Sequence, residues 1–267
     1  MLAKRIVSGL LFLPVFYLIV WKLAPLYLAV LVVIAAAVGQ YEFYRMAQNK
    51  GARPLSVLGM ALGSAIIIGG FYYRIPSDGG LLLYGAASML LITGVRLFSV
   101  RSVDGALEDV AATLLGIFYV ALLFGFQVGV RLGGDGKQWI VFMYFVIWAT
   151  DIGAYAVGMS FGKRRLYPKI SPKKSVEGLA GGLLFAAVMA LLCRVWFMPP
   201  VSIAEAAGVG LLLASAGTIG DLVESMLKRS AGVKDSGTII PGHGGMLDRM
   251  DSMLFAAPVL FYYLMFR

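Results

Sequence analysis

The sequence predicts an all-α, polytopic integral membrane protein with about nine transmembrane helices and a cytoplasmic N-terminus. Hydrophobic residues make up 60% of the 267 positions and charged residues only 14%, whereas soluble domains carry about 25% charged residues. The mean hydropathy of +0.86 does not fit one soluble core of this size, because a globule must still present a polar surface to water. Charge-free windows of spanning length also recur along the chain. These three observations exclude a soluble enzyme.

The windows without Asp, Glu, Lys or Arg define the individual helices, because a charge at the bilayer centre costs about 2.5 to 3.5 kcal/mol on insertion scales. Five windows in the first half are wholly uncharged. In the second half, the sixth window contains Asp151 and the seventh carries Arg194 near its end. The first apolar run lacks a clear cleavage site, so it is assigned as a helix and not as a signal peptide. The predicted spans are 6–21, 23–41, 54–73, 79–95, 110–130, 138–162, 178–198, 202–220 and 252–266.

The orientation follows from the basic residues, which collect in cytoplasmic loops. With nine spans and the N-terminus inside, 17 of the 23 Lys and Arg residues fall on the cytoplasmic side. An error of one span would destroy this separation downstream of the error. The net charge of +9 is therefore interpreted as a topology signal that could also attract anionic lipid or nucleotide. We expect membrane lipids as partners and no nucleic acid.

The polar chemistry is concentrated in the second half, where eight of the 14 acidic residues lie from Asp151 onward. We expect residues 1–135 to form a scaffold of about five spans, which also offers a dimer surface. Residues 136–267 are expected to form a catalytic transmembrane region with cytoplasmic loops 162–177 and 228–250. Glu42 could be an exception within the scaffold, although it sits near a helix end.

The chain has only one cysteine and one histidine, which restricts the possible chemistry further. The lone Cys193 excludes an internal disulfide and a cysteine-based zinc cluster, and it is expected to fill the core. The lone His243 excludes metal sites that need several histidines. Polar chemistry must therefore come from carboxylates, Lys, Arg, Ser and the backbone.

A polar stripe continues the eighth span. Asp221, Glu224, Ser225 and Lys228 are spaced i, i+3, i+4 and i+7, so they share one helix face. Glu224 and Lys228 could simply form the ion pair of an exposed helix end. Asp221 follows 15 uncharged residues, so we expect it at or inside the headgroup level, where a carboxylate needs a cation.

Two more acids, Asp248 and Asp251, share a face at the start of the last span. They could simply complement the helix dipole. If they meet Asp221 at one membrane surface, however, the three carboxylates need a compensating charge, and oxygen ligands suit Mg²⁺. The glycine-rich stretch 236–247 is predicted to be an irregular loop whose N–H groups can approach phosphate. A nucleoside triphosphate would also find the basic residues Lys228, Arg229, Lys234 and Arg249 around this loop.

Asp151 and the basic run after it are the remaining candidates. A carboxylate inside a membrane span is expected to be functional, although Asp151 could be the structural partner of an arginine. The run that ends in Ser171-Pro172-Lys173-Lys174 could be a topology signal alone, but its spacing suggests a binding role.

Taken together, these motifs resemble the phosphatidate cytidylyltransferases, also called CDP-diacylglycerol synthases. The family pattern is Ser-x-x-Lys-Arg, four residues, Lys-Asp, a Pro-Gly-His-Gly-Gly turn and Asp-Arg-x-Asp. Upstream motifs between 148 and 178 also look like the family, whereas the N-terminal half resembles it only as a bundle of spans. The pattern is matched by Ser225, Lys228, Arg229, Lys234, Asp235, Pro241, Gly242, His243, Gly244, Gly245, Asp248, Arg249 and Asp251.

The resemblance implies transfer of CMP from CTP to phosphatidic acid, Mg²⁺ with room for a second cation, a homodimer, and a cytoplasmic-face site in the cell (inner) membrane. It implies metal ligation by Asp221, Asp248 and Asp251. The implied catalytic residues are these three acids with Lys228, Arg229, Lys234 and Arg249. The implied substrate-binding residues are Asp151, Ser171, Lys173, Lys174, Glu224, Ser225, Asp235, His243, Gly244 and Gly245.

Two other functions stay open at this point. A CTP-dependent lipid kinase would transfer the terminal phosphate to a polyprenol-type alcohol. A secondary transporter also has many spans and intramembrane acids, but the inverted repeats expected of one are missing from this sequence.

For the cytidylyltransferase, the lipid must reach the site sideways, which predicts a membrane-open cleft bounded by the last three or four helices.

Overall fold

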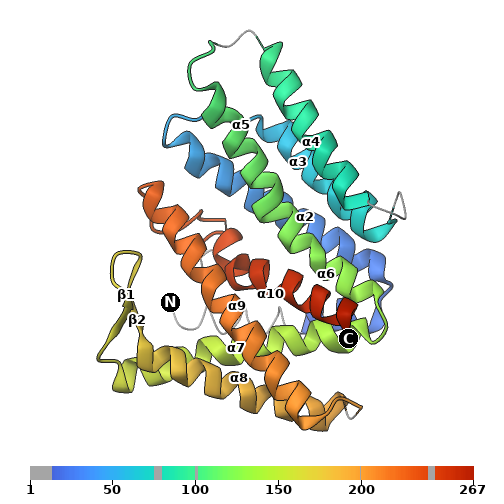
Figure 1. Cartoon of the computed structure of the whole chain (residues 1–267), viewed down its shortest axis with the longest axis vertical. Helices are drawn as coiled ribbons and strands as arrows, with labels where there is room; N and C mark the ends of the chain where they lie inside the picture. Colours follow the sequence, from blue (N-terminus) through green and yellow to red (C-terminus); the bar gives the residue numbers. More distant parts are fainter. Residues whose placement is uncertain (1–13, 75–79, 100–101, 199, 240–243) are drawn as a thin grey trace. The chain divides into compact units, whose positions relative to one another are not determined.

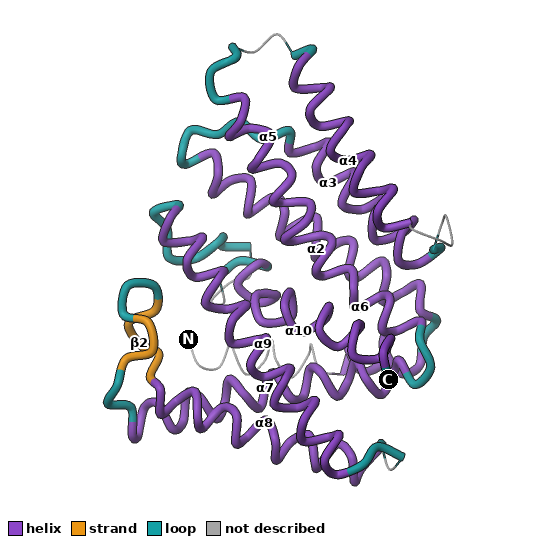
Figure 2. The backbone as a smooth tube through the Cα atoms, viewed as in Figure 1, coloured by secondary structure: helices purple, strands orange, loops and turns teal. Residues whose placement is uncertain are grey.

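A computed structural model of the chain describes residues 14–74, 80–99, 102–198, 200–239 and 244–267. Nearly all of the described residues are helical (Figures 1 and 2). The elements are η1 (Leu18–Lys22), α2 (Pro25–Gln48), α3 (Ser56–Ala65), η2 (Ile66–Tyr72), α4 (Gly80–Leu97), α5 (Ala106–Leu115), η3 (Gly116–Leu122), α6 (Leu123–Leu132), α7 (Gly136–Phe161), β1 (Arg165–Tyr167), β2 (Ser171–Ser175), α8 (Val176–Phe197), α9 (Ile203–Ser230) and α10 (Leu247–Phe266).

Six helices in the described part of the chain are long and apolar enough to cross a membrane. The protein is therefore a multi-pass, all-α membrane protein, as predicted. A shorter apolar helix covers Ser56–Tyr72, and α10 contains the predicted window 252–266. The first predicted window lies partly outside the described residues, so the count of nine and the orientation stay predictions. The six helices are Pro25–Gln48, Gly80–Leu97, Ala106–Leu132, Gly136–Phe161, Val176–Phe197 and Ile203–Ser230.

The chain forms two compact units. The first contains Met1–Leu132 and Ser230–Met250, and the second contains Gly133–Arg229 and Asp251–Arg267. The loop that follows α9 thus belongs to the unit of the N-terminal helices, and the predicted division into a scaffold 1–135 and a catalytic region 136–267 stays a prediction.

In the first unit, α2 is the central helix and packs against α3, η3 and α6. Several of its interior polar groups take part in hydrogen bonds to neighbouring helices. The Gln40 amide donates to the Tyr44 hydroxyl at 3.2 Å, and Tyr44 donates to the Thr113 carbonyl at 3.0 Å. A buried ion pair between Arg96 and Asp109, 3.0 Å long, joins the end of α4 to the start of α5. Such a network fixes the helices of this unit in one arrangement.

In the second unit, α7 and α8 run side by side along most of their length (Figure 1). Small residues allow this close approach. A Cβ on Gly153 would lie 2.8 Å from the carbonyl oxygen of Gly181, and one on Gly182 would lie 3.0 Å from that of Thr150. The close packing places the polar residues at the C-terminal end of α7 beside those at the start of α8.

The loop between α7 and α8 holds the only two strands among the described residues. β1 and β2 pair as an antiparallel hairpin (Figure 2). The sequence predicted only helices and loops here. The paired segments are three and five residues long, too short to show the alternating pattern from which a strand is predicted.

Candidate functional site

A polar cleft of about 730 Å³ lies in the second unit, between α7, the hairpin, α8 and α9. Both acids predicted there, Asp151 and Asp221, line it. Lys173 and Lys174 line it from β2, and Arg165 from β1. The structure thus brings the acid of the sixth span, the Lys-rich loop and Asp221, the first residue of the α9 stripe, together around one cleft.

An ion pair joins two walls of this cleft. The Lys174 ammonium lies 2.5 Å from a carboxylate oxygen of Asp221, and both side chains are about a quarter exposed. Asp221 also accepts a long hydrogen bond of 3.4 Å from Ser225. A third acid, Asp251, interacts electrostatically with Asp221 and Asp151, which repel it, and with Lys228, which attracts it. The like charges of three acids are thus concentrated in one region of the second unit.

The other three residues of the α9 stripe are buried. Lys228 forms an i, i+4 ion pair with Glu224, whose side chain is fully buried. The possibility that this is merely the pair of an exposed helix end is therefore wrong. Arg229 is exposed and donates to the carbonyl of Ile170 at 3.4 Å, which connects α9 to the hairpin turn. Ser171 is partly exposed where β2 begins.

Glu177, on the first turn of α8, holds the beginning of the basic loop. Its carboxylate accepts from the backbone N–H of Lys163 at 3.0 Å and of Arg164 at 3.1 Å. Ser175 caps the same helix by accepting from the N–H of Gly178 at 3.0 Å. No role for Glu177 could be predicted from the sequence. The available signal was an acid just after a Ser cap, the usual beginning of a helix.

In the first unit, Asp248 holds the two described ends of the glycine-rich loop, at Ser236 and Gly245. One oxygen of Asp248, Oδ2, accepts from the N–H of Ser236 (3.0 Å), the hydroxyl of Ser236 (2.9 Å) and the N–H of Gly245 (2.8 Å). Gly244 has a φ of +84°, a conformation that glycine adopts at little cost. In this structure the Gly245 N–H thus donates to Asp248, and its predicted contact with phosphate stays a prediction.

Glu42, which the sequence marked only as a possible exception within the scaffold, also contacts this loop. Its buried carboxylate accepts from Ser236 and from the N–H groups of Met246 and Leu247. These partners are about 200 positions away in the sequence, so no local periodicity connects them to Glu42. The first half of the chain therefore contributes directly to the loop.

The remaining candidates lie at the surface or outside the described residues. Lys234, Asp235 and Arg249 are exposed. His243, with Pro241 and Gly242, lies outside the residues that the structure describes.

Comparison with known proteins decides the family. The model of the cytidylyltransferase family matches residues 3–267. The chain belongs to the cytidylyltransferase family. It is therefore a nucleotidyltransferase, and the resemblance noted in its sequence is confirmed.

Curated relatives support the same assignment. The phosphatidate cytidylyltransferase of Bacillus subtilis is 36% identical over 262 residues, 98% of this chain and 97% of the relative. That of Staphylococcus epidermidis RP62A is 37% identical over 212 residues, 77% of this chain and 78% of the relative. That of Staphylococcus aureus COL is 42% identical over 153 residues, 57% of this chain and 58% of the relative.

The acids of this cytidylyltransferase fit a hard divalent cation that is bound together with substrate phosphates. Among the described residues, no group of three or more His, Cys, Asp or Glu side chains is gathered closely enough to hold a metal. Mg²⁺ does not need such a group, because it is commonly bound through one or two carboxylates plus substrate phosphates. Asp221 already holds a cationic group, the Lys174 ammonium. The donor set therefore fits Mg²⁺ that arrives with a nucleotide.

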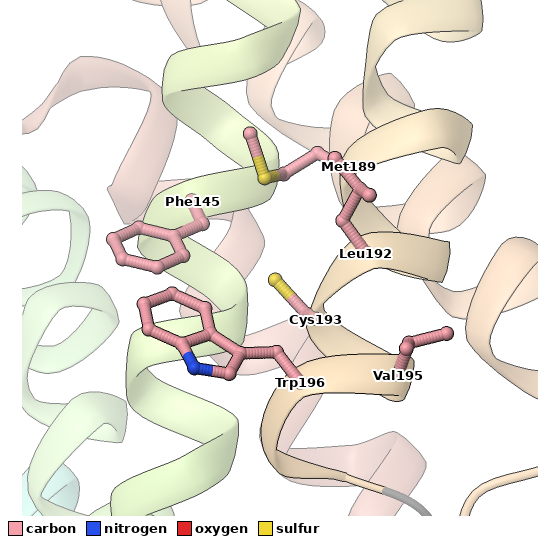
Figure 3. Close-up of a pocket in the computed structure, with 6 residues that line it drawn as sticks. All are labelled: Phe145, Met189, Leu192, Cys193, Val195 and Trp196. Atoms are coloured by element: carbon pink, nitrogen blue, oxygen red, sulfur yellow. The ribbon is translucent and has the colours of Figure 1, made fainter.

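A second pocket on α7 and α8 is apolar. It has a volume of about 740 Å³ and is lined by Phe145 of α7 and by residues of α8 that include Cys193 and Trp196 (Figure 3). The rings of Phe145 and Trp196 are stacked with centroids 6.3 Å apart. Cys193 is 1% exposed, as expected of a core-filling residue. Such a lining suits hydrocarbon and offers no chemistry of its own.

Proposed function

We propose that this protein transfers the CMP group of CTP to phosphatidic acid, forming CDP-diacylglycerol and pyrophosphate. The observation that carries the proposal is the 36% identity to a phosphatidate cytidylyltransferase over 98% of the chain. The polar cleft supports it, because it combines carboxylates with lysines, as phosphoryl chemistry on a nucleoside triphosphate requires. A lipid kinase and a transporter are not favoured by these relatives.

In the proposed reaction, a phosphate oxygen of phosphatidic acid forms a bond to the α-phosphorus of CTP. The bond between that phosphorus and the oxygen bridging to the β-phosphorus breaks, and pyrophosphate leaves with the electron pair. The attacking phosphate is already an anion at neutral pH, so the protein supplies neither a strong base nor a nucleophile. Its task is to position two anions and neutralise their charge.

The lysines of the cleft are suited to that task. Lys174 is held in place by Asp221 at 2.5 Å, and Lys173 lines the same cleft. We assign them, with Ser171 and Asp151, to substrate binding. Lys228, Arg229, Lys234 and Arg249 are assigned to neutralising the triphosphate and the departing pyrophosphate. The residues Glu224, Ser225, Asp235, His243, Gly244 and Gly245 complete the proposed substrate-binding set.

Mg²⁺ is the proposed cofactor, with room for a second cation. Asp221 and Asp251, which repel each other within the second unit, and Asp248, whose Oδ2 orders the glycine-rich loop, are the proposed ligands. When bound, the metal would stabilise negative charge on the phosphates of CTP.

The membrane arrangement is also part of the proposal. We infer nine spans with a cytoplasmic N-terminus, a homodimer, and a site at the cytoplasmic face of the cell membrane. The distribution of basic residues supports the orientation. The same site would have to be open to the bilayer, so that phosphatidic acid enters sideways.

The test is product analysis with the purified protein in detergent. CTP, Mg²⁺ and phosphatidic acid labelled in an acyl chain should give labelled CDP-diacylglycerol and one pyrophosphate per product. Release of CDP with phosphorylation of an alcohol would instead indicate a lipid kinase. Ion uptake into vesicles without nucleotide turnover would indicate a transporter.

A further inference from the structure

The last helix begins without a cap of its own. The first N–H groups of any α-helix have no partner within the helix, and a Ser, Thr, Asp or Asn side chain just before it usually accepts from them. Here α10 begins at Leu247, and the residue before it is Met246. A methionine side chain is at most a weak acceptor, so these N–H groups need an acceptor from elsewhere.

Glu42 of α2 supplies that acceptor from about 200 residues away. Its Oε1 accepts from the N–H of Met246 at 3.0 Å, and its Oε2 accepts from that of Leu247 at 2.9 Å. The residue is 2% exposed. A buried carboxylate at a helix N-terminus stabilises it both through charge-assisted hydrogen bonds and through the helix dipole.

The same carboxylate is linked to Asp248 through one hydroxyl. Ser236 Oγ lies 3.1 Å from Glu42 Oε2 and 2.9 Å from Asp248 Oδ2. A hydroxyl has a single proton, so it donates to one of the two carboxylates at a time. Ser236 therefore connects the position of Asp248 to that of Glu42.

Two glycines of the loop leave the space that Glu42 occupies. A Cβ on Gly237 would lie 2.4 Å from Glu42 Oε1, and a Cβ on Gly245 would lie 2.5 Å from Oε2. Real side chains do not approach so closely, so a side chain at either position would have to displace the Glu42 carboxylate. The glycines thus have a role in packing around Glu42, beside the phosphate contact predicted from the sequence.

We propose that Glu42 is a positioning residue for CMP transfer. It fixes Ser236 and residues 244–247 on either side of 240–243, together with the first turn of α10, and through Ser236 it sets the position of Asp248. Glu42 itself does not touch substrate. This inference rests on the proposed function, because it assigns Asp248 to the catalytic machinery.

The test is Glu42→Gln, which keeps the size of the side chain but removes its charge and replaces one acceptor oxygen by an NH₂ donor. We expect kcat to fall at least about tenfold, with KM for phosphatidic acid within about twofold of wild type. The Mg²⁺ concentration for half-maximal rate should rise, because Asp248 is displaced. Glu108→Gln removes an exposed acid of the same unit and should change none of these three quantities.

A structural readout that does not depend on turnover accompanies the kinetics. Hydrogen exchange should become faster in Glu42→Gln in peptides that cover Ser236 and 244–250, because Met246 and Leu247 lose their acceptor. Peptides from α7 and α8 should exchange as in wild type. Glu42→Asp keeps the charge and both acceptor oxygens, so it should recover part of kcat.

Three results would overturn the inference. Wild-type kcat and exchange in Glu42→Gln would show that the contact does not matter. A lower yield of folded protein, with unchanged kcat and Mg²⁺ dependence per folded molecule, would reduce Glu42 to a stabilising residue. If wild type itself forms no CDP-diacylglycerol, the proposed function fails and the catalytic part of this inference fails with it, whereas faster exchange would still identify the contact.

Discussion

In each of the two loops that carry predicted site residues, a glutamate carboxylate accepts backbone N–H groups, but the two carboxylates differ in burial. In the first unit, Glu42 accepts two backbone N–H groups and shares the Ser236 hydroxyl with Asp248 while almost fully buried. In the second unit, Glu177 accepts two backbone N–H groups at a partly exposed position. Water can replace the bonds of an exposed carboxylate, whereas buried donors that lose their acceptor stay unsatisfied. The difference predicts that the first loop depends strongly on its anchor and the second only weakly.

The largest effect is expected when Asp248 is changed to Asn. The variant loses the carboxylate charge that accepts from Ser236 and Gly245, and with it a proposed metal ligand. We therefore expect kcat to fall about a hundredfold or more. Steady-state kinetics over a range of Mg²⁺ concentrations measures the effect, and Asp104→Asn, at an exposed position, is the control. Full activity of the variant at ordinary Mg²⁺ concentration would remove Asp248 from the metal site.

In the second unit, the two neighbouring lysines form a matched pair for the next prediction. Lys174 pairs with Asp221, whereas Lys173 is exposed at the cleft. Lys174→Met should lower kcat/KM for CTP about tenfold or more, because the cleft loses a cation and Asp221 loses its partner. Lys173→Met should have a smaller effect, seen in KM for one substrate. Equal and negligible effects for both variants would reduce the basic loop to a topology signal.

Most of the spans could be predicted from the sequence because charges are excluded from hydrocarbon. The predicted window 23–41 nevertheless ends before its helix, because α2 continues to Gln48, whereas the helical extension predicted for the eighth span is present in α9, which ends at Ser230. Charged residues stop an apolar window but not a helix, which continues into the headgroups and water. The short hairpin was missed because so few residues carry no pattern.

The candidate site could be predicted where its residues are close in the sequence. The spacing of Asp221, Ser225 and Lys228 indicated one helix face, and the ion pair between Asp221 and Lys174 places the Lys-rich loop beside that face. The contacts of Glu42 could not be predicted, because a contact over about 200 residues depends on how helices pack and not on local periodicity. Glu42 was visible in the sequence as an acid at the end of the uncharged window 23–41, but its hydrogen-bond partners were not.

A smaller effect, on stability, is expected around the buried anchor. Gly237→Ala places a Cβ against Glu42 Oε1, and overpacking of this kind costs about 1 to 3 kcal/mol. Gly94→Ala, on α4, has open space within 4 Å and should be neutral or stabilising by up to about 1 kcal/mol. Denaturation in detergent compares the two variants. Equal stability would mean that Glu42 does not fill the space beside Gly237.

The smallest effect is expected for Glu177→Gln. The amide keeps one acceptor oxygen, and water can satisfy the N–H groups of Lys163 and Arg164 at this exposed position. We expect kcat/KM to fall about two- to threefold, which corresponds to less than 1 kcal/mol. A loss as large as that of Glu42→Gln would contradict the proposed difference between the two anchors.

The central claim, transfer of CMP to a lipid phosphate, is tested most directly by following both ends of the triphosphate. Purified protein is incubated with phosphatidic acid, Mg²⁺ and CTP that carries one label on its α-phosphate or another on its γ-phosphate. The account predicts that the α-label enters the lipid and that the γ-label appears in pyrophosphate, in equal amounts. Transfer of the γ-label to lipid, with the α-label released in CDP, would contradict it.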